Sequence, residues 1–164
     1  MLTDSLVEAF RARLEQSGFD LADLRIGGTP NRPLVQVRID WPPPAPAADV
    51  GGGVPLRQVT VADCTRASRV LEAWIDAGGA GPLGNRYVLE VSSPGLERPV
   101  RWPRHWARFV GRDVNVKVAG QGRVRARIVA VPTPETVVLE PHGKGAVEYR
   151  LVELKDARLA ADDR

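Results

Sequence analysis

The tetrapeptide Ser-Ser-Pro-Gly at positions 92–95 separates two parts of the chain whose hydrophobic periodicities differ. Before it, apolar residues recur both at helical spacing and in strict alternation, whereas after position 112 almost every segment alternates. A helix needs apolar residues every three to four positions, and a strand needs them at every second position. The change of period therefore predicts two small domains of different architecture within 164 residues.

Residues 1–91 carry the pattern of an α+β domain. Leu6, Phe10 and Leu14 recur at helical spacing, and a second helical run begins after Thr60, a residue type that caps helix N-termini. Strand-like alternation occupies three segments, 22–26, 35–39 and 86–91. The predicted order is helix, strand, strand, helix, strand, which is typical of a small α+β layer.

A low-complexity segment, WPPPAPAADVGGGVP at 41–55, lies between the second predicted strand and the second predicted helix. Its prolines and glycines supply neither helical nor strand periodicity, so we expect a surface loop. Cys64 lies on the apolar stripe of the helix that follows, where we expect it to be part of the core. Because it is the only cysteine, the chain has no internal disulfide, and we expect a reducing, cytoplasmic location.

Residues 101–164 predict a short helix followed by a small barrel. Pro103 suits the first position of a helix that Gly111 ends. Five alternating runs follow, at 113–118, 123–131, 135–140, 146–151 and 151–159. We expect these strands to close into an SH3-like or Sm-like β-barrel, because closure protects the edges of a small sheet.

Residues 92–100 connect the two predicted domains. A serine that follows a strand can be a nucleophile, but the pattern here is not G-x-S-x-G, and the two histidines of the chain lie in unrelated contexts. The proline and the glycine instead suit the central positions of a type II turn. We therefore expect no enzymatic activity, no metal and no cofactor. The predicted interdomain joint consists of Ser92, Ser93, Pro94 and Gly95.

Positive charge is concentrated in the second part of the chain. Residues 1–98 contain 10 Lys and Arg against 12 Asp and Glu, whereas residues 99–164 contain 13 against 8. Most of these cations are arginines, whose planar guanidinium groups suit phosphates. Two groups are candidates for binding RNA: Arg98, Arg101, Arg104, Arg108 and Arg112 around the predicted short helix, and Arg123, Arg125 and Arg127 along a predicted strand.

Each group also has a simpler interpretation. Arg104 and Arg108, four positions apart, share a helix face that could be merely solvated, and the tryptophans nearby could be core residues. The three strand arginines share one side of a strand, where like charges repel one another unless an anion is bound. Glu140 and Glu148 on neighbouring predicted strands could instead form ordinary surface ion pairs with them.

Three segments together resemble the bacterial ribosome maturation factor RimP family: LEVSSPGLERPV at 89–100, VTVADCTRASRVLEAW at 59–74 and RFVGRDVNV at 108–116. The likeness extends over nearly the whole chain. Two departures are a longer Pro/Gly-rich loop at 42–55 and Trp102 at a position where a polar helix cap is common. The resemblance implies an α+β domain over 1–91 and an Sm-like barrel over 101–164.

For function, the resemblance implies a non-enzymatic factor that binds the free small (30S) ribosomal subunit and assists its late assembly. The partners that it implies are rRNA and a small-subunit ribosomal protein, and we expect a cytoplasmic monomer that does not contact membranes. The residues by themselves leave a second interpretation open, a generic single-stranded RNA-binding module that uses the barrel.

Overall fold

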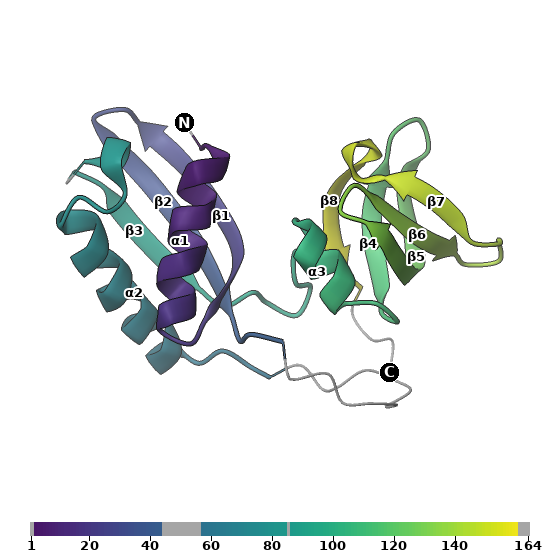
Figure 1. The fold of residues 1–164 in the computed structure, drawn as a ribbon, viewed down its shortest axis with the longest axis horizontal. Helices are drawn as coiled ribbons and strands as arrows, with labels where there is room; N and C mark the ends of the chain where they lie inside the picture. The colour runs from purple at the N-terminus through teal and green to yellow at the C-terminus, as the bar shows by residue number, and fades with distance from the viewer. Residues whose placement is uncertain (1, 44–56, 85, 161–164) are drawn as a thin grey trace. The chain divides into compact units, whose positions relative to one another are not determined.

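The computed structural model describes residues 2–43, 57–84 and 86–160, which belong to two compact units. Along the described chain, the boundary between the units falls between Pro94 and Gly95. Figure 1 labels the helices and strands of each unit. Apart from its first three residues, the predicted loop at 41–55 lies outside the described residues.

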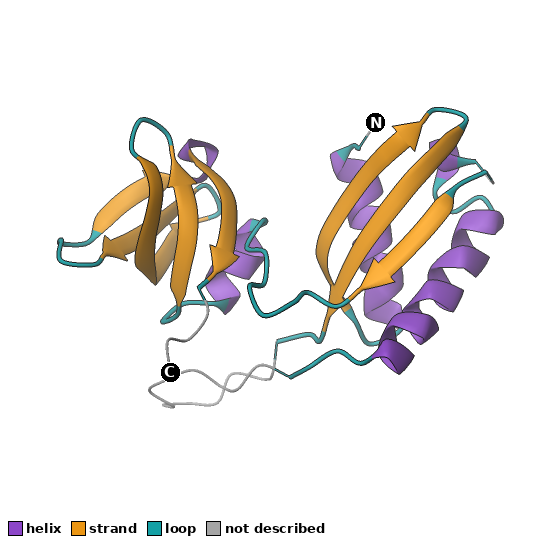
Figure 2. Cartoon of the chain, turned by 180° about the vertical axis from the view of Figure 1, so that it is seen from behind, coloured by secondary structure: helices purple, strands orange, loops and turns teal. Residues whose placement is uncertain are grey.

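The first unit consists of two helices and a three-stranded sheet. Strands β1 and β2 form an antiparallel hairpin, and β3 joins the other edge of β2 in parallel. Both helices cover one face of this sheet (Figure 2). The α+β class and the order of elements are as predicted. The elements are α1 (Asp4–Gln16), β1 (Asp20–Thr29), β2 (Arg32–Asp40), α2 (Val61–Asp76), the 3-10 turn η1 (Gly81–Leu83) and β3 (Val88–Ser92).

Local chemistry determines where α2 begins and which side it buries. The hydroxyl of Thr60 accepts a hydrogen bond from the N–H of Asp63, and the Asp63 carboxylate accepts one from the N–H of Thr60. This capping box satisfies amides at the helix start. The hydrogen bonds that the Asp63 carboxylate accepts from the N–H and from the hydroxyl of Thr60 lower the pKa of Asp63. The apolar sides of α1 and α2 bury Phe10 and Leu71 in the core. Cys64 is only half-buried, so its expected place in the core is wrong.

The second unit consists of one short helix and a five-stranded sheet. The hydrogen-bonded order of the strands is β7-β6-β5-β4-β8, and all neighbours are antiparallel. No helix within the described ranges of either unit is long and apolar enough to cross a membrane. The elements are α3 (Pro103–Arg108), β4 (Asp113–Val118), β5 (Gly122–Thr133), β6 (Thr136–Pro141), β7 (Val147–Arg150), the 3-10 turn η2 (Leu151–Glu153) and β8 (Leu154–Leu159).

The pairing of the described strands does not confirm the expected closed barrel. The hydrogen-bonded order begins at β7 and ends at β8, so these two strands form no ladder with each other in the described part of the chain. Only η2 separates them in sequence, and the sheet therefore curls so that its two ends approach one another (Figure 1). The second unit is thus a curved antiparallel sheet with α3 beside it.

The last residues of the predicted linker belong to the second unit by their hydrogen bonds. Gly95 has a φ of +80°, the left-handed conformation that a type II turn requires at its third residue. Beyond it, the N–H of Val100 donates to the carbonyl of Ala157 at 2.9 Å, and the N–H of Leu159 donates to the carbonyl of Arg98 at 2.8 Å. The segment that follows the turn is therefore attached to β8.

Candidate nucleic-acid interface

Arg98, the first of the predicted RNA-binding arginines, is buried in the second unit. Its exposed fraction is 5%, and its carbonyl accepts the hydrogen bond from Leu159. Pairing with β8 draws this segment against the sheet, so the guanidinium presents almost no area to a nucleic acid. Burial therefore removes Arg98 from the expected basic surface.

Two of the other arginines near α3 flank one indole ring. The Cζ atoms of Arg101 and Arg104 lie 5.1 and 4.9 Å from the ring centroid of Trp102, which is the N-cap residue of α3. Trp102 itself is half-buried. Cation–π contact favours a particular placement of each guanidinium, and a guanidinium has five N–H donors to share among its partners. This cluster can therefore present oriented cations.

The remaining aromatic residues of the segment are core residues, in agreement with the simpler interpretation. Trp106 and Phe109 are 2% and 3% exposed. The Cζ atom of Arg108 lies 5.1 Å from the Phe109 ring centroid, and Arg112 is half-buried after the helix ends. These two arginines therefore lie at the margin of the core, so part of each side chain is packed against the unit.

The three strand arginines lie on one side of β5, as the alternation predicted. Between them Ala126 is fully buried, while Arg123 and Arg127 are exposed and Arg125 is half-buried. A guanidinium nitrogen of Arg123 lies 2.9 Å from a carboxylate oxygen of Asp156, and Nε of Arg125 lies 3.5 Å from one of Asp113. We call this solvent-facing side of β5, β4 and β8 the outer face.

The acidic partners on the outer face differ from those considered from the sequence. Asp113 comes from β4 and Asp156 from β8. Glu140 lies opposite Arg127 in the register of β5 and β6. Glu148 lies opposite Val138 on β6, two strands away from the arginines. Strand order, which has no local sequence signal, decides these pairings.

Sequence reasoning missed three cations of the outer face. Lys117 on β4 lies opposite Arg123 on β5 and opposite Lys155 on β8. One step along the strands, Asn115 lies opposite Arg125 and Arg158. The alternation of β4 does place Lys117 on the polar side, but only the β4–β8 pairing brings Lys155 and Arg158 beside it.

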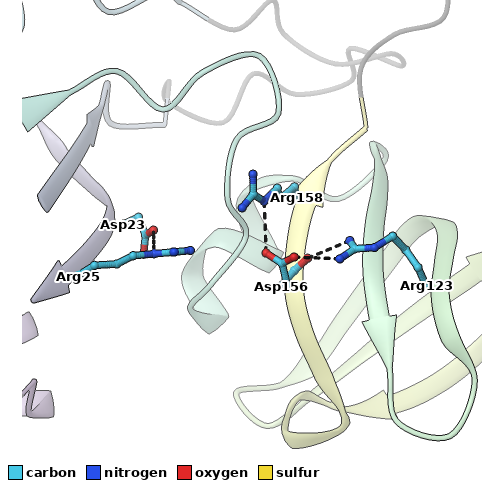
Figure 3. Close-up of polar contacts among 5 residues, drawn as sticks. All are labelled: Asp23, Arg25, Arg123, Asp156 and Arg158. Atoms are coloured by element: carbon cyan, nitrogen blue, oxygen red, sulfur yellow. Dashed lines mark hydrogen bonds and ion pairs between the residues drawn. The ribbon is translucent and has the colours of Figure 1, made fainter. Parts of the chain in front are cut away.

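A β-bulge in β8 inserts a carboxylate among these cations. Asp156 has a φ of +48°, and the register between β4 and β8 shifts at this point. Its carboxylate accepts hydrogen bonds from Arg123 at 2.9 Å and from Arg158 at 3.3 Å (Figure 3). The hydrogen bond from Arg123, followed by the charge of Arg158, lowers the pKa of Asp156.

The predicted joint residues lie at the end of the first unit and the start of the second. Ser92 is the last residue of β3 and is exposed, and Ser93 is half-buried. Pro94 is buried, and Gly95 adopts the left-handed conformation described above. This geometry is that of a turn between two units.

Comparison with known proteins links both parts of the chain to one family. A family model described as the RimP N-terminal domain matches residues 10–97. The ribosome maturation factor RimP of Frankia casuarinae is 42% identical over 114 residues, which cover 66% of this chain and 38% of that protein. The ribosome maturation factor RimP of a Parafrankia species is 36% identical over 148 residues, which cover 77% and 44%. The chain therefore spans less than half the length of these two relatives.

Proposed function

Because this chain belongs to the RimP family, we propose that it is a ribosome maturation factor that binds the free small (30S) ribosomal subunit and assists its late assembly. The family match over 10–97 carries this proposal. The excess of cations after position 98 supports it, since rRNA is a polyanion. The factor acts by binding, as a cytoplasmic monomer, and catalyses no reaction.

The proposed domain boundaries follow the two units. Residues 1–91 form the α+β domain, residues 92–100 the linker, and residues 101–164 a domain of Sm-like type. The short turn η2 between the end strands of the curved sheet favours the Sm-like assignment. The hydrogen bonds of Arg98 and Val100 to β8 favour counting the end of the linker with the second domain.

The proposed contacts to rRNA lie in the second domain. The cluster of Arg101 and Arg104 around Trp102 supplies oriented guanidinium groups. Arg108 and Arg112, which follow in the sequence, are the other proposed contacts of this segment. The outer face supplies Arg123, Arg125 and Arg127. Arginines of this kind position a protein on a nucleic acid through phosphates and do not read its sequence. Recognition of the small subunit therefore also needs a contact to a small-subunit ribosomal protein.

Co-sedimentation tests the proposal directly. The full chain is mixed separately with purified free small subunits, with joined ribosomes and with a short single-stranded RNA at physiological salt. We expect it to sediment with free small subunits and much less with joined ribosomes. Equal binding to both, or to neither, would refute the proposal.

The same experiment decides the alternative. A generic single-stranded RNA-binding module would bind the short RNA as tightly as it binds the subunit, because stacking and phosphate contacts need no assembled partner. The cation-rich outer face is the observation that favours this alternative.

A further inference from the structure

We infer that one end of the outer face is a phosphate-binding site for an RNA backbone, formed by Lys155, Lys117 and Arg123. We call these three residues the cationic row. The inference rests on the proposed function, since it identifies which part of the second domain meets rRNA. It also assigns a role to Lys117 and Lys155, two lysines that were not among the candidates from the sequence.

The first argument is the position of the three cations in the sheet. Lys117 lies directly opposite Arg123 on one neighbouring strand and directly opposite Lys155 on the other. Directly opposite residues in antiparallel strands have Cβ atoms about 4.5–5.5 Å apart, and like charges at such positions destabilise the sheet. All three side chains are exposed. Lys117 therefore repels both of its neighbours. The ion pair of Arg123 with Asp156 offsets part of this repulsion, and a bound anion would offset more of it.

The second argument is that charge changes sign along the outer face. The cationic row lies at one end, and Arg125, Asn115 and Arg158 form the next level. At the far end, Arg127 lies opposite both Asp113 and Glu140. At that end two carboxylates flank one cation, whereas the cationic row has three cations and one neighbouring carboxylate, that of Asp156. A phosphate is therefore less favoured beside Arg127 than at the row. The favourable end for a polyanion is therefore the cationic row.

The third argument is the role of Asp156. Asp156 is the non-glycine residue that adopts positive φ in the described chain, at the bulge of β8. Aspartate adopts this conformation more readily than most residues, so the bulge can place a carboxylate here at little cost. The bulge sets the Asp156 carboxylate between Arg123 and Arg158, and its ion pairs go to these two arginines. The carboxylate therefore holds Arg123 in place beside the exposed lysines. Holding a long side chain before binding reduces the entropy lost on binding.

The test compares two full-length triple variants that lose the same number of charges. The first carries Lys117→Gln, Arg123→Gln and Lys155→Gln. The control carries Arg32→Gln, Arg86→Gln and Lys144→Gln, three exposed residues that do not belong to β4, β5 or β8. Affinity is measured against salt concentration, both for free small subunits and for oligouridine. Each neutralised phosphate of a single strand contributes roughly 0.7 to the log–log slope.

We expect the first variant to reduce the steepness with which log affinity falls with log salt concentration by up to about 2. The control should leave this steepness nearly unchanged. Equal slopes for both variants would overturn the assignment of the row. If the wild-type chain does not sediment with free small subunits, the proposed function fails. In that case, the salt dependence of oligouridine binding still shows whether the cationic row binds phosphates.

A charge reversal guards against an effect of misfolding. Lys117→Glu places a carboxylate opposite Arg123 and Lys155, which turns two repulsive pairs into attractive ones. We expect its melting temperature at low salt to equal or exceed that of the wild type, while oligouridine affinity falls. A lower melting temperature with unchanged affinity would contradict the inference.

Discussion

Two residues at positive φ shape the backbone at the boundary between the units and in the bulge of β8. Gly95 adopts φ +80° between the two units, and Asp156 adopts φ +48° in the bulge of β8. A Cβ atom added at Gly95 has nothing within 4 Å, so the restriction there comes from the backbone conformation alone. At Asp156, by contrast, the conformation places a carboxylate between two arginines.

The first prediction concerns the joint. Gly95→Val should strain the turn by roughly 1–2 kcal/mol or make it adopt another form, and small-subunit binding should weaken. Gly95→Asn is the matched control, because asparagine tolerates the left-handed conformation. The double variant Ser92→Ala, Ser93→Ala should cost only about 1 kcal/mol for each hydroxyl hydrogen bond lost, and it should keep binding. Sedimentation and chemical unfolding measure both effects.

One combination of results would contradict the first prediction and indicate a chemical role for Ser92 or Ser93. That combination is a double serine variant that is normally stable but inactive, together with a Gly95→Val variant that behaves as wild type.

The second prediction concerns alkaline pH. Burial, and then the hydrogen bond that Tyr87 donates to Asp76 at 2.9 Å, raise the pKa of Tyr87 to about 12 from 10.0. A raised pKa stabilises the folded state below the unfolded pKa, and this contribution is lost as pH rises from about 10 to about 12. We expect the free energy of unfolding to fall more steeply over this window in the wild type than in Tyr87→Phe. Identical pH profiles in urea unfolding would show that the phenol contributes nothing.

At the scale of elements, the residue that follows β2 contacts the residues that precede α2. Nε1 of Trp41 donates to the carbonyl of Gln58 at 2.9 Å, and the Arg57 guanidinium lies 3.6 Å from the Trp41 ring centroid. The Trp41 ring also lies 5.2 Å from that of Phe19, which is buried in the core. Trp41, Arg57 and Gln58, which lie on either side of residues 44–56, are therefore held against the first unit by contacts that the composition did not indicate.

The third prediction compares the contribution of Trp41 to stability with that of residues 44–56. Trp41→Ala should destabilise the protein by about 2 kcal/mol, less than the loss of a fully buried aromatic, because the ring is half-exposed. Replacing residues 44–56 by a four-residue link should leave the melting temperature near that of the wild type. Each halving of the length of a flexible loop changes the free energy of loop closure by only about 0.6 kcal/mol. A large drop for the shortened chain, measured by thermal unfolding, would show that 44–56 contribute to the core.

At the scale of the whole molecule, each unit has its own sheet and its own buried residues. Leu24 and Leu71 are fully buried in the first unit, and Val114 and Ile128 in the second. The second unit includes the segment at 98–100, in which Val100 is 3% exposed and pairs with β8. The two units should therefore fold separately if the chain is cut before this segment.

The fourth prediction follows from this boundary. A fragment of residues 95–164 should unfold cooperatively and be more stable than a fragment of residues 101–164. The shorter fragment loses the hydrogen bonds of Arg98 and Val100 to β8, each worth about 1 kcal/mol, together with the burial of Val100. Urea unfolding of both fragments measures the difference. Equal stability would show that the linker ends where the helix α3 begins.

Local patterns by themselves determined the α+β class, the order of the elements, the N-cap of α2 and the alternation along β5. Each of these depends on residues a few positions apart, so period and capping chemistry suffice to predict it. The family could be inferred in the same way, because the signature around residues 92–95 is a continuous run of residues.

Tertiary structure decided the burial of Arg98, the partners of the strand arginines and the cationic row. These features depend on which strands become neighbours, and β4 pairs with β8 across about forty residues of intervening chain. Strand pairing is selected by the packing of the whole sheet, and a one-residue bulge reassigns every side chain beyond it to the other face. No local pattern records that choice, so the neighbours of Lys117 became visible only in the folded sheet.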